Sequence, residues 1–71
     1  MNSSKIIGVI SKALGQKVTE SSNVQNTKKW DSLGHLQILA ALDKFTKGKS
    51  SKISKLNDAT SVRAIIKLLT K

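Results

Sequence analysis

Three segments of the chain repeat apolar residues at the spacing of one helix face, and no segment alternates as a strand does. The first stripe consists of Ile6, Ile10, Ala13 and Leu14. The second consists of Leu33, Leu36, Leu39, Ala40, Ala41, Leu42 and Phe45. The third consists of Val62, Ile65, Ile66 and Leu69. Because such stripes bury one face of an amphipathic helix, the sequence predicts three main helices packed on one another. The second stripe is wide enough to indicate several neighbours.

Residues suited to helix ends flank each of these segments. The predicted helices cover residues 3–14, 32–47 and 61–70. The candidate N-caps are Ser3 or Ser4, Asp31, and Thr60 or Ser61, and the candidate stop residues are Gly15 and Gly48. Ser, Thr and Asp side chains accept hydrogen bonds from the first turn of a helix, and glycine adopts the left-handed conformation that ends one. The caps and the stripes therefore predict the same three helices.

The connection between the first two helices is long and polar. Residues 16–30 contain Val18, Val24 and Trp30 as apolar exceptions. A loop of this length is uncommon in a compact domain unless it is functional or is held by a few anchors. We expect these three side chains to be the anchors.

A second, shorter connection precedes the last helix. Residues 49–57 are polar apart from Ile53 and Leu56, whose spacing of three fits one short helical turn or a tethered loop. The chain has no proline and no internal repeat. We therefore predict a single all-α domain over residues 1–71, a small four-helix bundle with three main helices and a short third one.

The composition excludes several classes of site. The chain has no cysteine, so it has no disulfide framework, thiolate metal site or cysteine nucleophile. One histidine and four acidic residues are too few for most metal or acid–base constellations, so no metal and no catalytic residue is predicted. The apolar run at residues 6–10 is interrupted by Ser11 and Lys12 and is far shorter than a membrane span of about 20 residues. The default expectation is a soluble cytoplasmic protein.

The formal net charge of +9 is the least ordinary property of the composition. Such a charge fits nucleic acid, an anionic membrane or an acidic protein partner. Arg63 is the only arginine, although arginine is the usual residue for bidentate phosphate and base recognition. Trp30 and Phe45 are the only aromatic residues available for stacking on single strands. A small basic nucleic-acid-binding helical protein is the alternative hypothesis on function. The charge is equally explained by a lysine-rich surface that is simply solvated.

The stretch from residue 30 to residue 36, Trp-Asp-Ser-Leu-Gly-His-Leu, contains the candidate site. It places Ser32 in the first turn of the second predicted helix, directly after the long polar loop. A helix N-terminus offers free N–H groups and the positive end of the helix dipole, so it suits a serine that carries a phosphate-linked group. An Asp-Ser-Leu tripeptide is also an ordinary helix start.

The chain resembles the acyl carrier proteins. In that family an Asp-Ser-Leu motif opens the second helix of a small bundle, and its serine carries 4′-phosphopantetheine. The matching residues here are Asp31, Ser32 and Leu33. The resemblance covers nearly the whole chain, because its length, long first loop, aliphatic second helix and short third segment are similar to those of stand-alone carriers. The stretch from Trp30 to Leu36 resembles discrete carriers used outside bulk fatty-acid synthesis.

The resemblance implies a non-catalytic carrier rather than an enzyme. Ser32 would receive the arm of coenzyme A from a phosphopantetheinyl transferase, which brings the metal and the base. The arm would hold an acyl or aminoacyl group as a thioester and present it to an acyl-loading ligase and to acyl-transfer enzymes. The pathways implied are lipid, polyketide or surface-polysaccharide biosynthesis. A cytoplasmic monomer is expected, with no nucleic acid and no membrane as partner.

The neighbours of Ser32 have more than one predicted role. Asp31 is expected to cap the helix, and in the family the matching aspartate also serves the transferase reaction. Leu33 is expected to pack in the core or to border the path of the arm, with the core favoured. His35 shares a helix face with Ser32, so it could bind the phosphodiester, meet a partner enzyme or have no chemical role. A serine–histidine catalytic pair is disfavoured, because no orienting group or oxyanion hole accompanies it.

The sequence departs from the family in its charge. Acyl carriers are usually acidic, and their second helix meets basic patches on partner enzymes, but residues 34–45 contain Asp43 as their only acidic residue. Lysines follow instead, at Lys44, Lys47, Lys49, Lys52 and Lys55. Either the partners have less basic or acidic docking faces, or apolar contacts from residues such as Leu36 and Ile38 dominate recognition. A third possibility is that Ser32 is no longer modified.

Overall fold

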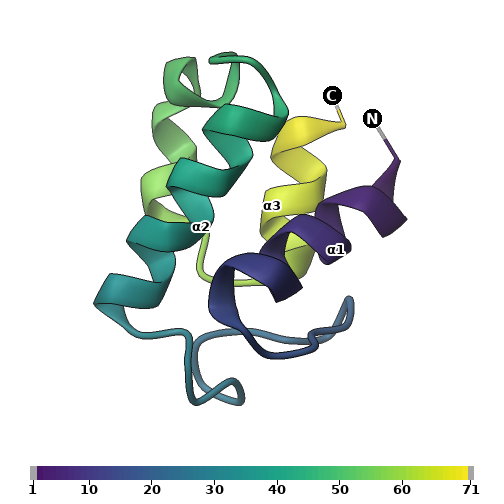
Figure 1. The fold of residues 1–71 in the computed structure, drawn as a ribbon, viewed down its shortest axis with the longest axis vertical. Coiled ribbons are helices and arrows are strands. Elements are labelled where there is room, and N and C mark those ends of the chain that lie inside the picture. Colours follow the sequence, from purple (N-terminus) through teal and green to yellow (C-terminus); the bar gives the residue numbers. More distant parts are fainter. Residues whose placement is uncertain (1, 71) are drawn as a thin grey trace.

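Three α-helices and two short 3₁₀ helices make up the computed structural model, which describes residues 2–70 (Figure 1). They are α1 (Ser3–Leu14), α2 (Ser32–Phe45), η1 (Ser50–Lys52), η2 (Ser54–Asp58) and α3 (Val62–Leu69). Between residues 2 and 70 the only β pairing is an isolated antiparallel bridge from Asn23 to Ser61. The prediction of an all-α chain is therefore confirmed. Within the same range, no helix is long and apolar enough to cross a membrane.

The C-terminal end of α2 is determined by hydrogen bonds of one side chain and by the backbone angle of the next residue. The predicted bounds of α1 are confirmed, but α2 ends at Phe45, two residues before its predicted end. Thr46 is buried; its Oγ1 donates to the carbonyl of Leu42 at 2.8 Å and accepts from the N–H of Ser50 at 2.9 Å. Lys47 then has a φ of 57°, which no α-helix allows. This turn directs the chain into η1.

The predicted N-caps are confirmed in α2 and α3 but not in α1. Asp31 and Ser61 cap α2 and α3, accepting from the N–H groups three residues on at 2.8 and 3.1 Å. The prediction of Ser3 or Ser4 as the cap of α1 is wrong, because both lie inside the helix. Asn2 has the extended backbone of an N-cap, and its Oδ1 accepts from the N–H of Ser4 at 2.7 Å.

The short segment before α3 forms two 3₁₀ helices, so a fourth α-helix is not observed over the described residues. Ile53 separates η1 from η2 and is half-buried, whereas Leu56 is 2% exposed. The predicted pair of apolar residues therefore does attach this segment, with Leu56 as the main contact. A buried leucine stabilises such a segment by about 1.5–3 kcal/mol relative to an exposed one.

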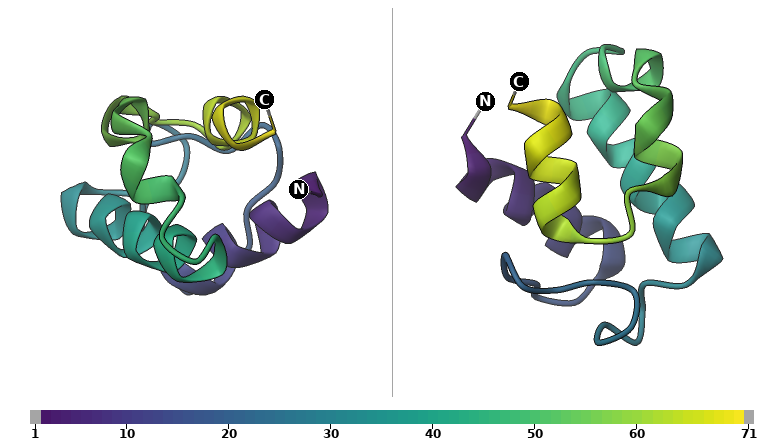
Figure 2. Two further views of the ribbon diagram at one scale, coloured as in Figure 1. Left: turned by 90° about the horizontal axis from the view of Figure 1, so that it is seen from above. Right: turned by 180° about the vertical axis from the view of Figure 1, so that it is seen from behind.

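The core lies between α1, α2, α3 and η2 (Figure 2). α1 packs mainly on α2, and α3 contacts α1 and η2. The buried apolar residues are Ile6, Ile10, Leu14, Val18, Trp30, Ile38, Leu42, Leu56, Ala59, Val62 and Ile65. Each helix contributes residues from its predicted stripe, so the period of the apolar residues correctly indicates the buried faces of α1 and α3.

α2 buries a narrower face than the sequence predicts. Ile38 and Leu42 are fully buried, but Leu33 is 64% exposed and Leu36 is 62% exposed. The expectation that Leu33 packs in the core is wrong, and the fully buried Ile38 is not available to a partner. The reason is that α2 has its close neighbours, α1 and η1, on part of its circumference, so one edge of the apolar face meets solvent.

The long loop is attached to the rest of the fold at several points. Val18 and Trp30 are each 2% exposed, so these two predicted anchors are confirmed. Val24 is 37% exposed and is not a buried anchor; instead its N–H donates to the carbonyl of Thr60 at 3.0 Å. Thr27 is also buried, at 3% exposed, although no apolar pattern predicts it. The loop therefore lies against the start of α3.

A glycine permits the first turn of α2 to approach the end of this loop. A Cβ built on Gly34 would overlap the carbonyl oxygen of Lys29 and lie 3.0 Å from a methyl carbon of Leu14. Gly8, in α1, has no neighbouring atom within 4 Å of the same position. Close packing therefore requires glycine at position 34 but not at position 8.

We expect Gly34→Ala to lower the free energy of unfolding by about 1–3 kcal/mol, because the added methyl group forces backbone apart. Gly8→Ala is the matched control and should raise it by about 1 kcal/mol through helix propensity alone. Urea denaturation followed by circular dichroism measures both values. Equal effects of the two substitutions would contradict the close approach at Gly34.

Candidate functional site

The N-terminus of α2 exposes a serine in a well-defined position. Asp31 caps the helix, with its Oδ1 accepting from the N–H of Gly34 at 2.8 Å and its carbonyl accepting from His35 at 2.8 Å. Ser32 is the first residue of α2 and is exposed. Helix geometry gives the N–H groups of Ser32 and Leu33 no acceptor within the helix. These two donors and the helix dipole favour an anion next to Ser32.

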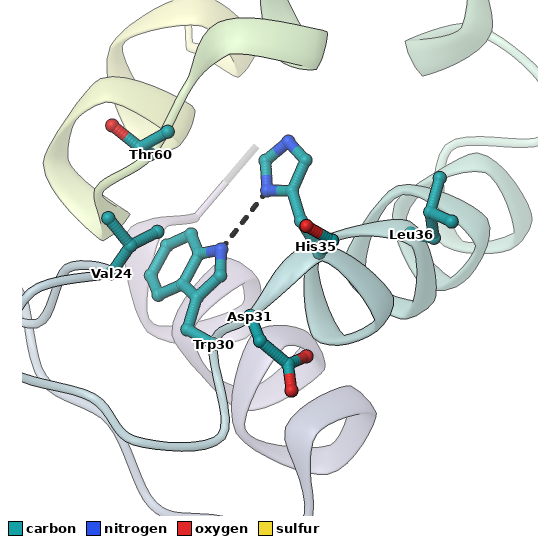
Figure 3. Close-up of a pocket in the computed structure, with 7 residues that line it drawn as sticks. Val24, Trp30, Asp31, His35, Leu36 and Thr60 are labelled. Atoms are coloured by element: carbon teal, nitrogen blue, oxygen red, sulfur yellow. Dashed lines mark hydrogen bonds between the residues drawn. The ribbon is translucent and has the colours of Figure 1, made fainter.

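Charges of both signs lie near this N-terminus. Lys28 and Lys29 are exposed and end one residue before the cap, and the Nζ of Lys29 donates to the carbonyl of Gly15 at 3.3 Å. The Asp31 carboxylate adds a negative charge, but one of its oxygens is already held by Gly34. The close-up in Figure 3 shows the Asp31 carboxylate pointing away from the imidazole of His35.

A groove of about 520 Å³ opens beside Ser32. It is lined by Val24, Trp30, Asp31, Ser32, His35, Leu36 and Thr60. In Figure 3, Val24 and Thr60 lie on one side of the Trp30 indole and His35 lies on the other. The groove therefore joins the long loop, the start of α2 and the residue before the cap of α3, and most of its wall is apolar. A flexible group attached to Ser32 would have an apolar surface directly beside it.

His35 connects three parts of the fold. The Nε1–H of Trp30 donates to Nδ1 of His35 at 3.0 Å, and Nε2 of His35 lies 3.0 Å from the carbonyl oxygen of Leu56. Because an indole nitrogen can only donate and a carbonyl can only accept, the geometry assigns His35 as the neutral tautomer with its proton on Nε2. The two ring planes are nearly parallel, with an interplanar angle of 16° and ring centroids 6.2 Å apart, as an in-plane hydrogen bond between them requires. We call this arrangement the Trp30–His35–Leu56 bridge.

The bridge limits what His35 can do at the site. Both ring nitrogens already have protein partners, so a hydrogen bond to a phosphodiester on Ser32 would require one of them to be given up. For the same reason His35 is not available as a base for the Ser32 hydroxyl. A serine–histidine catalytic pair thus lacks both supporting groups and a free histidine nitrogen.

The predicted site residues are brought together only in part. Asp31, Ser32 and His35 border the groove, whereas Leu33 does not line it and points to solvent. Val24 and Thr60 line the groove but were proposed only as an anchor and a cap, because sequence spacing does not reveal which distant segments meet. Among residues 2–70, no three His, Asp or Glu side chains gather as they would to hold a metal ion.

Comparison of the chain with protein-family models, with curated proteins and with solved structures found no match.

We expect His35→Leu to lower the free energy of unfolding by about 1–3 kcal/mol, since the buried indole N–H then has no acceptor. Gln37→Leu is the matched control, because Gln37 is exposed on the same helix, and it should change stability by less than about 0.5 kcal/mol. Urea denaturation followed by circular dichroism measures both. If the two variants are equally stable, the bridge contributes nothing measurable to folding.

Proposed function

We propose that this protein is an acyl carrier protein that carries 4′-phosphopantetheine on Ser32. The observation that supports the proposal most directly is an exposed serine at the first position of α2, next to an apolar groove. A carrier must supply a hydroxyl that a transferase can reach, a helix N-terminus that tolerates a phosphodiester and a surface for partner enzymes. The first two requirements are met at Ser32, and the exposed part of α2 supplies the third.

The residues around Ser32 fit the attachment reaction. Ser32 Oγ would lose its proton to a base of the transferase and bond to the pantetheine-bearing phosphorus of coenzyme A. The P–O bond within the diphosphate would break, and adenosine 3′,5′-bisphosphate would leave with the electron pair. A separate transferase supplies the base and the metal, which agrees with the engagement of both His35 nitrogens elsewhere. When bound, the arm supplies a thiol that holds an acyl group as a thioester. The chain itself holds the attachment point still and offers the groove beside it.

The proposed fold class is a four-helix bundle of the acyl-carrier type. In this proposal η1 and η2 take the place of the short third helix, with Leu56 as its buried residue. The partners would be a phosphopantetheinyl transferase, an acyl-loading ligase and acyl-transfer enzymes of lipid, polyketide or surface-polysaccharide biosynthesis. The carrier would act as a monomer in the cytoplasm and catalyse no reaction itself.

Burial of the tryptophan weighs against the nucleic-acid alternative. Trp30 is 2% exposed, and its ring N–H is held by His35, so it cannot stack on a base. Phe45 is 38% exposed and is then the one aromatic side chain available among the described residues. Stacking usually supplies much of the affinity for single strands. The carrier proposal therefore remains the better supported of the two.

Incubation with coenzyme A and a broad-specificity phosphopantetheinyl transferase should add one phosphopantetheinyl group to the chain, as measured by intact mass. Ser32→Ala should abolish the adduct, because it removes the only hydroxyl at the start of α2. Ser54→Ala is the control, since Ser54 is likewise exposed and begins η2. Absence of an adduct with every such transferase, or an adduct that persists in Ser32→Ala, would refute the assignment.

Two substitutions separate the structural and the reactive roles of Asp31. Asp31→Asn should leave stability nearly unchanged because Asn also caps helices, whereas Asp31→Ala should cost about 1 kcal/mol. If the carboxylate also serves the transfer, Asp31→Asn should slow loading of Ser32 by about tenfold, the equivalent of roughly 1.4 kcal/mol. Urea denaturation and the rate of adduct formation measure the two effects. Loading of Asp31→Asn at the wild-type rate would restrict Asp31 to capping.

A further inference from the structure

Between Ser32 and Asp43, the exposed side of α2 carries no charge. Leu33 and Leu36 are 64% and 62% exposed, and Gln37 and Ala40 are exposed as well. Their spacing of i, i+3, i+4 and i+7 places the four on one side of the helix, beginning at the residue after Ser32. We call these four residues the uncharged α2 face. Burying leucines against a partner gains free energy that this chain alone does not use.

The surroundings of the uncharged α2 face are strongly basic. No lysine or arginine occurs between residues 32 and 43, but exposed lysines flank this stretch on both sides. They are Lys28 and Lys29 before it and Lys44, Lys47, Lys49, Lys52 and Lys55 after it. η1 packs against α2, so part of this second group lies beside the helix and not only beyond its end.

The two carboxylates at the ends of this stretch offset the seven lysines only in part. Asp31 uses one oxygen to cap α2, accepting from Gly34 at 2.8 Å. Asp43 has its Oδ1 buried, and that atom has no hydrogen-bond partner among the described residues. A protein approaching the uncharged α2 face therefore meets two exposed leucines in a stretch that has exposed lysines before and after it.

We infer that the uncharged α2 face is the docking surface for this carrier's enzymes, and that those enzymes present an apolar pocket bordered by carboxylates. The inference rests on the proposed function, since it assigns the partner surface for reactions at Ser32. Lysines at the edge of the contact speed encounter and select partners of opposite charge, while the leucines are buried in the complex. The docking charge is thus the reverse of the usual one for acyl carriers.

A protein fits this surface better than other anionic partners do. Nucleic acid is held through direct contacts between cations and phosphates, but the centre of this surface contains leucine and alanine instead. Surface attachment to a membrane requires a long apolar helix face, whereas Leu33 and Leu36 are the two exposed leucines of a helix whose other face is buried in the core.

The test compares two forms of one phosphopantetheinyl transferase. One form has a basic carrier-docking face, and in the other form those basic side chains are replaced by glutamate. Both are first matched by their rates on a short uncharged serine peptide. With coenzyme A and intact-mass detection at low salt, the acidic form should load Ser32 about tenfold faster than the basic form, and added salt should reduce the difference.

Variants of the uncharged α2 face provide the internal controls. The double substitution Gln37→Glu and Ala40→Glu should reverse the preference between the two transferases, and Gln37→Lys with Ala40→Lys should keep it. Leu33→Ser and Leu36→Ser should each slow loading by both enzymes, whereas Gln25→Ser, in the exposed long loop, should not. Circular dichroism checks that every variant is folded.

The possible outcomes have separate meanings. If wild-type protein is loaded equally fast by both transferases, or faster by the basic one, the inferred partner charge is wrong although the carrier function stands. If neither enzyme modifies Ser32 at any salt concentration, the carrier function itself fails. Leu33-dependent binding to anionic phospholipid vesicles or to duplex DNA at physiological salt would assign the uncharged α2 face to that partner instead and overturn the inference.

Discussion

The hydrogen bond from the buried indole of Trp30 to His35 is the interaction on which the candidate site depends. A buried indole needs an acceptor for its N–H, and His35 serves as one because its own proton is directed at the carbonyl of Leu56. The long loop, α2 and η2 are thereby connected through one ring. Ser32 lies between Trp30 and His35 in the sequence, so its position is defined by contacts on both sides.

Helical periodicity was sufficient to predict the three α-helices, because 12 to 14 residues of α1 and α2 repeat their apolar side chains at a clear period. It could not show how much of each face is covered. Leu33 and Leu36 belong to the same stripe as Leu42, but the number of neighbours around α2 decides which of them is buried. The N-cap of α1 was misplaced by one or two residues, since Asn2, Ser3 and Ser4 are all good caps.

The position of Ser32 was predictable from its local motif, whereas the groove beside it was not. A helix start is encoded within a few residues, so Asp31 and Ser32 could be assigned before the structure was known. The groove requires Val24 and Thr60, which are 36 residues apart in the sequence and meet through a backbone hydrogen bond of 3.0 Å. The role of His35 depends likewise on the carbonyl of Leu56, a backbone group that no sequence motif reports.

The isolated β-bridge between Asn23 in the long loop and Ser61 before α3 has a consequence for the groove. One wall, Val24 and Thr60, belongs to the bridged segments, and the other, His35 and Leu36, belongs to α2. Two backbone hydrogen bonds of 3.0 Å join the bridged segments, from Val24 to Thr60 and from Val62 to Ser22. The width of the groove and the orientation of Ser32 are therefore governed by different contacts. If the chain is a carrier as proposed, the wall formed by Val24 and Thr60 can shift to admit cargoes of different bulk without moving Ser32.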